Sequence, residues 1–284
     1  MKIVTRRIET LTDVAWAYDV IILDQWGVLH NGTMPYVGTI KTLKAVASTG
    51  HRLAVLSNSG KRALVNASRI TQMGFPADLF ETIMTSGEAL WNDIKNARIP
   101  HQVFFPIERS TGDAEEWATG LDISLTTDLK TAEAMLLMGL PDGSSLAEWQ
   151  MILERALNRQ MTIYCSNPDM SSPRSEGKTV ISPGALACDY HKQGGKVVFY
   201  GKPYSPVFIA MQNALEAKPN RLLMVGDSLE HDIAGAHDVG WDSLLVVGGI
   251  HRDDFVGADS NQILTTMTRE KNLPEPTYMI ELLQ

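Results

Sequence analysis

The feature that most constrains the fold is a series of short apolar segments, each followed by a polar or glycine-containing turn and then by a helix-like stretch. Segments of this kind, four or five residues long, are typical of strands that are buried on both faces of a parallel sheet. Their alternation with helices predicts an α/β fold. The segments and their turns are Val20–Leu23 before Asp24, Arg52–Leu56 before Ser57-Asn58, Arg221–Val225 before Gly226-Asp227, and Ser243–Val247 before Gly248-Gly249.

A second set of apolar segments lies between the second and third members of the first set. These segments are His101–Phe105, Ala134–Gly139 and Met161–Asn167, and they predict another α/β unit. The chain has 284 residues, and at roughly 150 residues per domain this length favours two domains over one.

Composition excludes several classes of protein. With 44% hydrophobic and 20% charged residues, the chain is typical of a globular protein. A formal charge of -8 disfavours nucleic acid and anionic membranes as partners. Two cysteines in a chain of this length favour a reducing cytoplasm over a disulfide framework. No window reaches the ~18 uninterrupted apolar residues of a membrane span, so we expect a cytoplasmic protein.

Polar residues with a shared chemistry follow the predicted strands. Asp24, Ser57, Asn58 and Asp227 each come directly after or close behind an apolar segment, and Lys202 follows another one. In an open parallel sheet, ligands bind beyond the carboxyl ends of the strands, near the point where strand order reverses. We therefore expect two carboxylates, a hydroxyl, an amide and an ammonium at one edge of the sheet.

Two carboxylates in a partly dry cleft repel each other unless a cation separates them. Oxygen ligands from Asp24 and Asp227 match the preferences of Mg²⁺. Lys202, Ser57 and backbone N–H groups would then hold the oxygens of a phosphoryl group, which indicates phosphoryl transfer. Each aspartate taken singly is explained equally well as a helix N-cap, so the prediction depends on the whole set.

In order along the chain, these residues resemble the four motifs of the haloacid dehalogenase (HAD) superfamily. The inserted part is similar to the class IIA cap of the NagD-like branch, which holds nucleotide-, sugar- and pyridoxal-phosphate phosphatases. The motif segments are Asp24-x-x-Gly27-Val28-Leu29, Leu56–Ser59, Gly201-Lys202-Pro203 and Val225–Asp232, and those of the insert are Thr85–Ala89, Asn167-Pro168-Asp169 and Pro183–Ala187.

The resemblance implies a division of the chain. Residues 1–84 and 198–284 would form a Rossmann-like core with a doubly wound parallel sheet, and residues 85–197 would form an inserted α/β cap domain. Self-association through the cap is common in this class, so a homodimer is an expectation by resemblance.

The resemblance also implies roles for the acidic residues. Asp24 would be the nucleophile that forms an aspartyl-phosphate intermediate. Asp24, Asp227 and the backbone carbonyl of Trp26 would hold Mg²⁺, and Asp232 would support the metal from nearby. An ordinary acidic residue in the first turn of a helix explains Asp232 equally well.

Further roles concern the substrate. Ser57, Asn58 and Lys202 would bind the transferring phosphoryl group, and Asp169 would contribute to substrate specificity. The alternative for Asp169 is a simple turn, because Asn-Pro-Asp favours turns in any context.

The sequence departs from the family pattern at one position. Phosphatases of the superfamily usually carry a second aspartate two residues after the nucleophile, which protonates the leaving group, and here Trp26 stands at that place. His30 is a less favoured proton donor and is more readily explained as a surface histidine.

The sequence therefore predicts an enzyme, a Mg²⁺-dependent hydrolase of small phosphorylated metabolites that acts on phosphomonoesters or acyl phosphates. The alternative is a catalytically weak or inactive regulatory protein that binds metal and phosphate. A phosphonate or carbon–halogen hydrolase is a third, less favoured reading.

Overall fold

The computed structural model describes residues 5–173, 179–255 and 259–283, and its contacts divide the chain into two compact units. The first unit holds the chain up to Ser57, the segment Leu64–Met84 and the chain from Lys202 onward. The second unit holds Asn58–Ala63 and Thr85–Gly201. The assignment of residues 1–84 with 198–284 to a core and of 85–197 to a cap stays a prediction.

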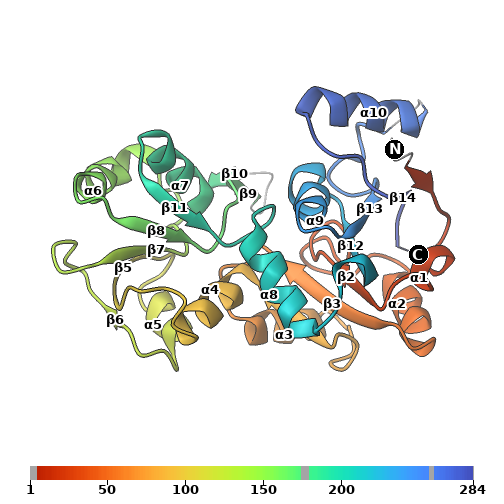
Figure 1. Cartoon of the computed structure of the whole chain (residues 1–284), viewed down its shortest axis with the longest axis horizontal. Helices are drawn as coiled ribbons and strands as arrows, with labels where there is room; N and C mark the ends of the chain where they lie inside the picture. Colours follow the sequence, from red (N-terminus) through yellow and green to blue (C-terminus); the bar gives the residue numbers. More distant parts are fainter. Residues whose placement is uncertain (1–4, 174–178, 256–258, 284) are drawn as a thin grey trace. The chain divides into compact units, whose positions relative to one another are not determined.

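The first unit is built on a seven-stranded sheet with the order β1-β14-β13-β12-β2-β3-β4 (Figure 1). From β1 to β3 across this order, every neighbouring pair is parallel. The chain runs from β2 to β3 and β4 on one side and later to β12, β13 and β14 on the other, so strand order reverses beside β2. The strands are β1 (Arg6–Arg7), β2 (Val20–Leu23), β3 (Arg52–Ser57), β4 (Thr82–Thr85), β12 (Leu222–Gly226), β13 (Asp242–Val246) and β14 (Tyr278–Ile280).

Both faces of this sheet are buried. Successive side chains of a strand point to opposite faces, and in β13 Leu244 joins one apolar cluster while Leu245 joins another. The first cluster includes Leu43 of α2, and the second includes Leu264 of α10. This burial explains the continuous apolar segments in the sequence. The helices of the first unit are α1 (Thr12–Ala15), α2 (Thr39–Ser48), α3 (Ala63–Gln72), α8 (Ser205–Leu215), α9 (Ala234–Asp238) and α10 (Ser260–Lys271), with short helical turns η2 (Pro219–Arg221) and η3 (Leu229–Ile233).

The second unit has its own five-stranded sheet with the order β11-β8-β7-β5-β6, in which every neighbouring pair is parallel (Figure 1). Its strands are β5 (Val103–Ile107), β6 (Ser124–Leu125), β7 (Ala134–Leu137), β8 (Thr162–Cys165) and β11 (Lys196–Phe199), and β9 (Ser171–Pro173) pairs antiparallel with β10 (Thr179–Ile181). Its helices are α4 (Ser86–Lys95), α5 (Asp113–Ala118), α6 (Leu146–Asn158) and α7 (Pro183–Lys192).

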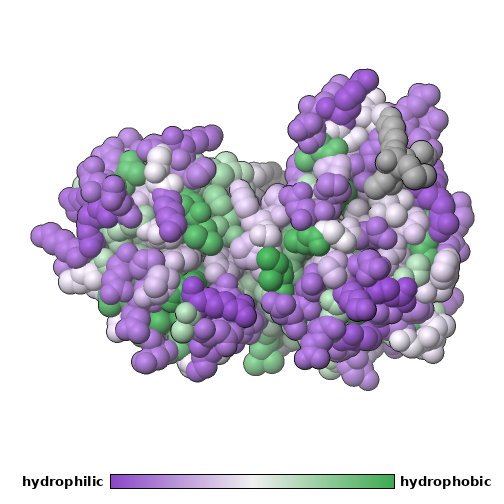
Figure 2. Space-filling view, viewed as in Figure 1, coloured by the Kyte–Doolittle hydropathy of each residue, from purple (hydrophilic) through white to green (hydrophobic). Residues whose placement is uncertain are grey.

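The predicted α/β class with a Rossmann-like parallel sheet is confirmed. Strand β2 has the predicted bounds, Val20–Leu23, and each of the other predicted segments coincides with a strand to within two residues at both ends. Figure 2 shows hydrophilic side chains over most of the visible face of each unit. Within the described ranges, no helix combines the length and apolar character needed to cross a membrane.

Candidate active site

Two aspartates leave the central strands of the first unit at the same edge of the sheet. Strands β2 and β12 pair with Leu23 opposite Val225, and the backbone N–H of Asp24 donates to the carbonyl of Val225 at 2.9 Å. Asp24 follows β2 directly, and Asp227 follows β12 directly. Both carboxylates therefore lie where strand order reverses, which is where an open parallel sheet binds its ligands.

Asp232 reaches the same place from η3, which is a single turn of π-helix. Its Oδ2 accepts a hydrogen bond from the backbone N–H of Ser228 at 3.1 Å. Gly226 allows this approach, because a Cβ at that position would lie 2.1 Å from Cγ of Asp232. Carboxylate oxygens of Asp24, Asp227 and Asp232 all lie within 4.8 Å of one another.

Lys202 places a buried ammonium between two of these carboxylates. Its Nζ donates to Oδ1 of Asp24 at 2.5 Å and to Oδ1 of Asp232 at 2.6 Å. The side chains of Lys202 and Asp232 are 3% and 1% exposed, and that of Asp24 is 14% exposed. Charge-assisted hydrogen bonds of this kind are short and strong, and here they fix both carboxylates relative to Lys202.

The pKa values of these groups reflect burial among like charges. Burial raises the pKa of Asp227 to about 8, and the nearby Asp24 and Asp232 carboxylates add to the rise. Burial also raises the pKa of Asp24 to about 6, although Lys202 opposes this shift. For Lys202, burial alone would lower the pKa, but the Asp232 and Asp24 carboxylates outweigh it and raise the pKa. The cluster therefore has more negative charge than Lys202 balances.

Backbone atoms enclose the Asp227 carboxylate closely. Gly27 has φ +83°, and a Cβ there would lie 1.8 Å from Oδ2 of Asp227. A Cβ at Gly249 would lie 2.3 Å from Cβ of Asp227, and the N–H of Ile250 donates to Oδ2 at 2.9 Å. At positions 27 and 249, only glycine allows the backbone to approach Asp227 this closely.

The donor set fits a divalent cation. Three carboxylates converge, with the ammonium of Lys202 among them. Oxygen-only donors suit hard cations such as Mg²⁺ and Ca²⁺. Both oxygens of Asp232 already accept hydrogen bonds, from Lys202 and Ser228, which favours Asp24 and Asp227 as the more direct ligands.

The residues predicted to bind phosphate are distributed over both units. Ser57 is the last residue of β3, which lies beside β2 in the first sheet, and is 9% exposed. Asn58 belongs to the second unit, where its Nδ2 donates to Oδ1 of Asp169 at 2.8 Å.

Trp26 lies against a tight turn in the loop after β2. Its side chain is 46% exposed, and a Cβ at Gly32, which has φ +101°, would lie 2.9 Å from the indole Nε1. The N–H of Gly32 donates to Nδ1 of His30 at 3.0 Å. Because Gly32 is held by His30 and has no side chain, the indole packs directly on the backbone of the turn.

The expectation that His30 lies on the surface is wrong. His30 is fully buried, and burial, with the charge of Arg69, lowers its pKa to about 4. Arg69 also donates to Oε1 of Gln25 at 3.0 Å. His30, Arg69 and Gln25 therefore form a cluster of polar side chains. A neutral imidazole that accepts a hydrogen bond from Gly32 supports the turn and is not a candidate proton donor.

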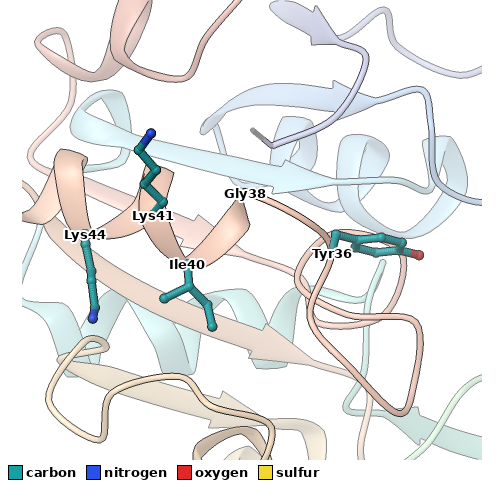
Figure 3. Close-up of a pocket in the computed structure, with 5 residues that line it drawn as sticks. All are labelled: Tyr36, Gly38, Ile40, Lys41 and Lys44. Carbon is teal, nitrogen blue, oxygen red and sulfur yellow. The ribbon is translucent and has the colours of Figure 1, made fainter.

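The structure also has an open groove, of about 460 Å³, at the start of α2. It is lined by Tyr36, Gly38, Ile40, Lys41 and Lys44. In Figure 3 the Lys41 and Lys44 side chains point in different directions, and Tyr36 points away from both. Since its charged groups do not converge, this groove is not the candidate site.

Sequence reasoning missed the residues that enclose Asp227. Gly249 was noted only as part of a turn that follows a predicted strand, and Ile250 was not noted at all. The signal was the Gly248-Gly249 pair, because adjacent glycines after a buried strand often mark a close approach of two backbones.

Two family profiles match this chain. One, described as haloacid dehalogenase-like hydrolase, matches residues 21–116, and the other, described as HAD-hydrolase-like, matches residues 199–279. Between them, they include every residue of the acidic cluster and Lys202.

Curated proteins and a solved structure are similar over most of the chain. Human (Homo sapiens) chronophin is 25% identical over 252 residues, which are 85% of each protein. Glycerol-3-phosphate phosphatase of Gallus gallus is 24% identical and covers 85% of this chain and 83% of its own. A haloacid dehalogenase-like hydrolase from Brucella suis 1330 is 26% identical with a TM-score of 0.79, and the match covers 98% of this chain and 100% of that one.

Proposed function

Because the chain belongs to the class IIA branch of the haloacid dehalogenase superfamily and is a hydrolase of phosphate esters, we propose that it hydrolyses small phosphorylated metabolites through phosphorylation of Asp24, with Mg²⁺ as cofactor. The observation that carries the proposal is the buried Lys202, which donates to Asp24 and Asp232 beside the third carboxylate, Asp227. The packing of a hydrophobic core does not account for three converging carboxylates, because such a cluster destabilises the folded chain.

The proposed reaction has two steps. First, a carboxylate oxygen of Asp24 attacks the phosphorus atom, a new O–P bond forms, and the leaving group departs with the electrons of its own O–P bond. Water then attacks the phosphorus of the aspartyl phosphate, which releases inorganic phosphate and restores the carboxylate. The ammonium of Lys202 opposes the rise that burial causes in the pKa of Asp24, and so favours the ionised carboxylate that acts as nucleophile.

Lys202 has two tasks in this proposal. Its hydrogen bond to Oδ1 of Asp24 orients the nucleophile, and its positive charge attracts the oxygens of the incoming phosphoryl group. Phosphoryl transfer depends mainly on positioning and charge stabilisation, which is what this ammonium supplies. Ser57 and Asn58 would provide further hydrogen bonds to the same group.

Asp24, Asp227 and the backbone carbonyl of Trp26 would hold Mg²⁺, and Asp232 would support it. When bound, the metal would offset the repulsion among the carboxylates and the negative charge of the phosphoryl group. Gly27, Gly249 and Ile250 hold the Asp227 carboxylate in a single orientation.

Trp26 determines which leaving groups are suitable. An indole does not donate a proton to a departing oxygen, and His30 is buried and engaged with Gly32. General acid catalysis is typically worth about 10²- to 10⁴-fold. We therefore expect the chain to favour acyl and aryl phosphates, whose leaving groups depart as stable anions, over alkyl phosphates.

The same feature favours a second candidate function. If the reaction without a proton donor is negligible, the chain would be a regulatory protein that binds metal and phosphate. Trp26 is the specific observation behind this alternative, because it stands where phosphatases of the superfamily usually carry a second aspartate.

Phosphate release distinguishes the two functions. The assay uses acyl, aryl, sugar, nucleotide and pyridoxal phosphates, with and without Mg²⁺, for the wild type and for Asp24→Asn. Release that needs both Mg²⁺ and Asp24 supports the hydrolase. Binding of phosphate with Mg²⁺ but no release above the Asp24→Asn level would favour the regulatory protein.

A further inference from the structure

The turn Asn167–Asp169, which follows β8 in the second unit, is held by its neighbours through the backbone. The N–H of Asp169 donates to Oδ1 of Asn167 at 3.0 Å, and the N–H of Gly184 donates to the carbonyl of Asp169 at 3.1 Å. A Cβ at Gly184 would lie 1.9 Å from the carbonyl oxygen of Pro168, and one at Gly201 would lie 2.2 Å from Cδ of Pro168. The turn therefore packs tightly between two glycines.

This turn carries the Asp169 carboxylate to Asn58. Nδ2 of Asn58 donates to Oδ1 of Asp169 at 2.8 Å. A carboxylate only accepts hydrogen bonds, so it selects the nitrogen end of the amide. The other end, Oδ1 of Asn58, lies 2.8 Å from where a Cβ at Gly201 would be. Asp169 and the bare backbone of Gly201 thus define the orientation of the Asn58 amide.

The segment that contains Asn58 is also attached at its far end, to the start of α4. The N–H of Gly87 donates to the carbonyl of Ser59 at 3.1 Å, and Oγ1 of Thr85 donates to the carbonyl of Lys61 at 2.6 Å. Gly87 has no room for a Cβ, which would lie 2.0 Å from the carbonyl oxygen of Gly60.

An ion pair completes this attachment. Arg62 donates to both carboxylate oxygens of Glu88, at 2.7 and 3.0 Å, and the N–H of Ala63 donates to the same carboxylate at 2.9 Å. These contacts fix the backbone of the segment that follows Asn58, and Asp169 is a partner that orients the Asn58 side chain.

We propose that Asp169 is a positioning residue that acts on the phosphoryl group through Asn58: its carboxylate sets the direction of the Asn58 amide and does not itself touch the substrate. This inference rests on the proposed function, in which Asn58 binds phosphate. It refines the role predicted for Asp169, because a residue that acts through Asn58 affects the phosphoryl group common to all substrates, and not the leaving group by which substrates differ.

The test is a double-mutant cycle read as phosphate affinity. Calorimetry with inorganic phosphate in Mg²⁺ is carried out on the wild type, Asp169→Ala, Asn58→Ala and the double variant. A hydrogen bond to a charged partner predicts that Asp169→Ala weakens phosphate binding by about 10- to 100-fold. The two single losses should not multiply in the double variant, because Asp169 has nothing to act on once Asn58 is truncated.

Two further variants separate positioning from loss of fold. Asp169→Asn keeps an oxygen acceptor of the same size, so it should recover most of the affinity that Asp169→Ala loses. Asp142→Ala removes a carboxylate of the same unit that pairs at the surface with Arg109, and it should leave phosphate affinity unchanged. Thermal unfolding of each variant checks that the second unit stays folded.

Steady-state kinetics give the results that would contradict the proposal. If Asp169 acts through Asn58, Asp169→Ala raises KM by a similar factor for acyl, aryl and sugar phosphates. Factors that differ with the leaving group, or single losses that multiply in the double variant, would overturn the proposal. Because calorimetry needs no turnover, a wild type that binds phosphate but releases none disproves the hydrolase and leaves the Asp169–Asn58 inference testable. A wild type that does not bind phosphate overturns both.

Discussion

Replacement of Trp26 by aspartate should give the site a proton donor and turn alkyl phosphates into good substrates. Proton donation by a positioned acid contributes about 10²- to 10⁴-fold, which is roughly 3–5 kcal/mol of the activation barrier. The gain should be largest for glycerol phosphate, whose alkoxide is a poor leaving group, and small for acetyl phosphate.

The substitution should be tolerated by the fold. The Trp26 side chain is 46% exposed, so it buries about half of the ~200 Å² that an aromatic side chain offers. At ~25 cal/mol per Å² this burial is worth roughly 2–3 kcal/mol, which is less than the 5–15 kcal/mol by which domains are typically stable. Gly32, on which the indole packs, keeps its hydrogen bond to His30.

The matched control is Trp26→Asn. Asparagine has the size of aspartate, but its amide does not transfer a proton to the leaving group. Steady-state kcat is measured for glycerol phosphate and acetyl phosphate on both variants and on the wild type. If Trp26→Asp is no faster than Trp26→Asn on glycerol phosphate, the reasoning about the missing acid is refuted.

Three other predictions follow from the geometry and charges. Gly27→Ala should lower activity by about 100-fold, as expected for a displacement of about 1 Å in an active site, because its Cβ would lie 1.8 Å from Oδ2 of Asp227; activity within a few-fold of wild type would contradict this. The pKa of His30 is lowered to about 4 in the folded state and is about 6.5 when unfolded, so the free energy of unfolding should fall by about 3 kcal/mol as the pH drops from about 6.5 to about 4. In urea unfolding, the His30→Gln variant should not show this fall. Equal pH dependence of the free energy of unfolding in both proteins would refute the prediction. The wild type should hydrolyse 4-nitrophenyl phosphate faster than glycerol phosphate, and equal rates would show that another group donates the proton.

Much of the fold was predictable because burial on both faces of the sheet leaves a clear pattern. Val20–Leu23 is fully apolar and became β2 with the same bounds. Strands β1 and β6 have only two residues each and sit at sheet edges, so they carry no such pattern. Their presence depends on neighbouring strands that sequence periodicity does not reveal.

The acidic cluster was predictable for a related reason. Asp24 and Asp227 follow strands whose carboxyl ends meet, and the topology alone brings them together. The enclosure of Asp227 by Gly27 and Gly249 was not predictable, because it depends on backbone approach and on the positive φ of Gly27. The link from Asn58 to Asp169 joins residues 111 positions apart, and no local pattern indicates such a contact.

Whether Asp24 becomes phosphorylated is tested most directly by mass spectrometry of protein quenched in acid during turnover of an acyl phosphate with Mg²⁺. Trp26 offers no base to activate water in the second step, so the intermediate should accumulate. The account predicts one phosphoryl group on the peptide that contains Asp24, and none in Asp24→Asn. Phosphate release that continues in Asp24→Asn, with no phosphorylated peptide in either protein, would contradict it.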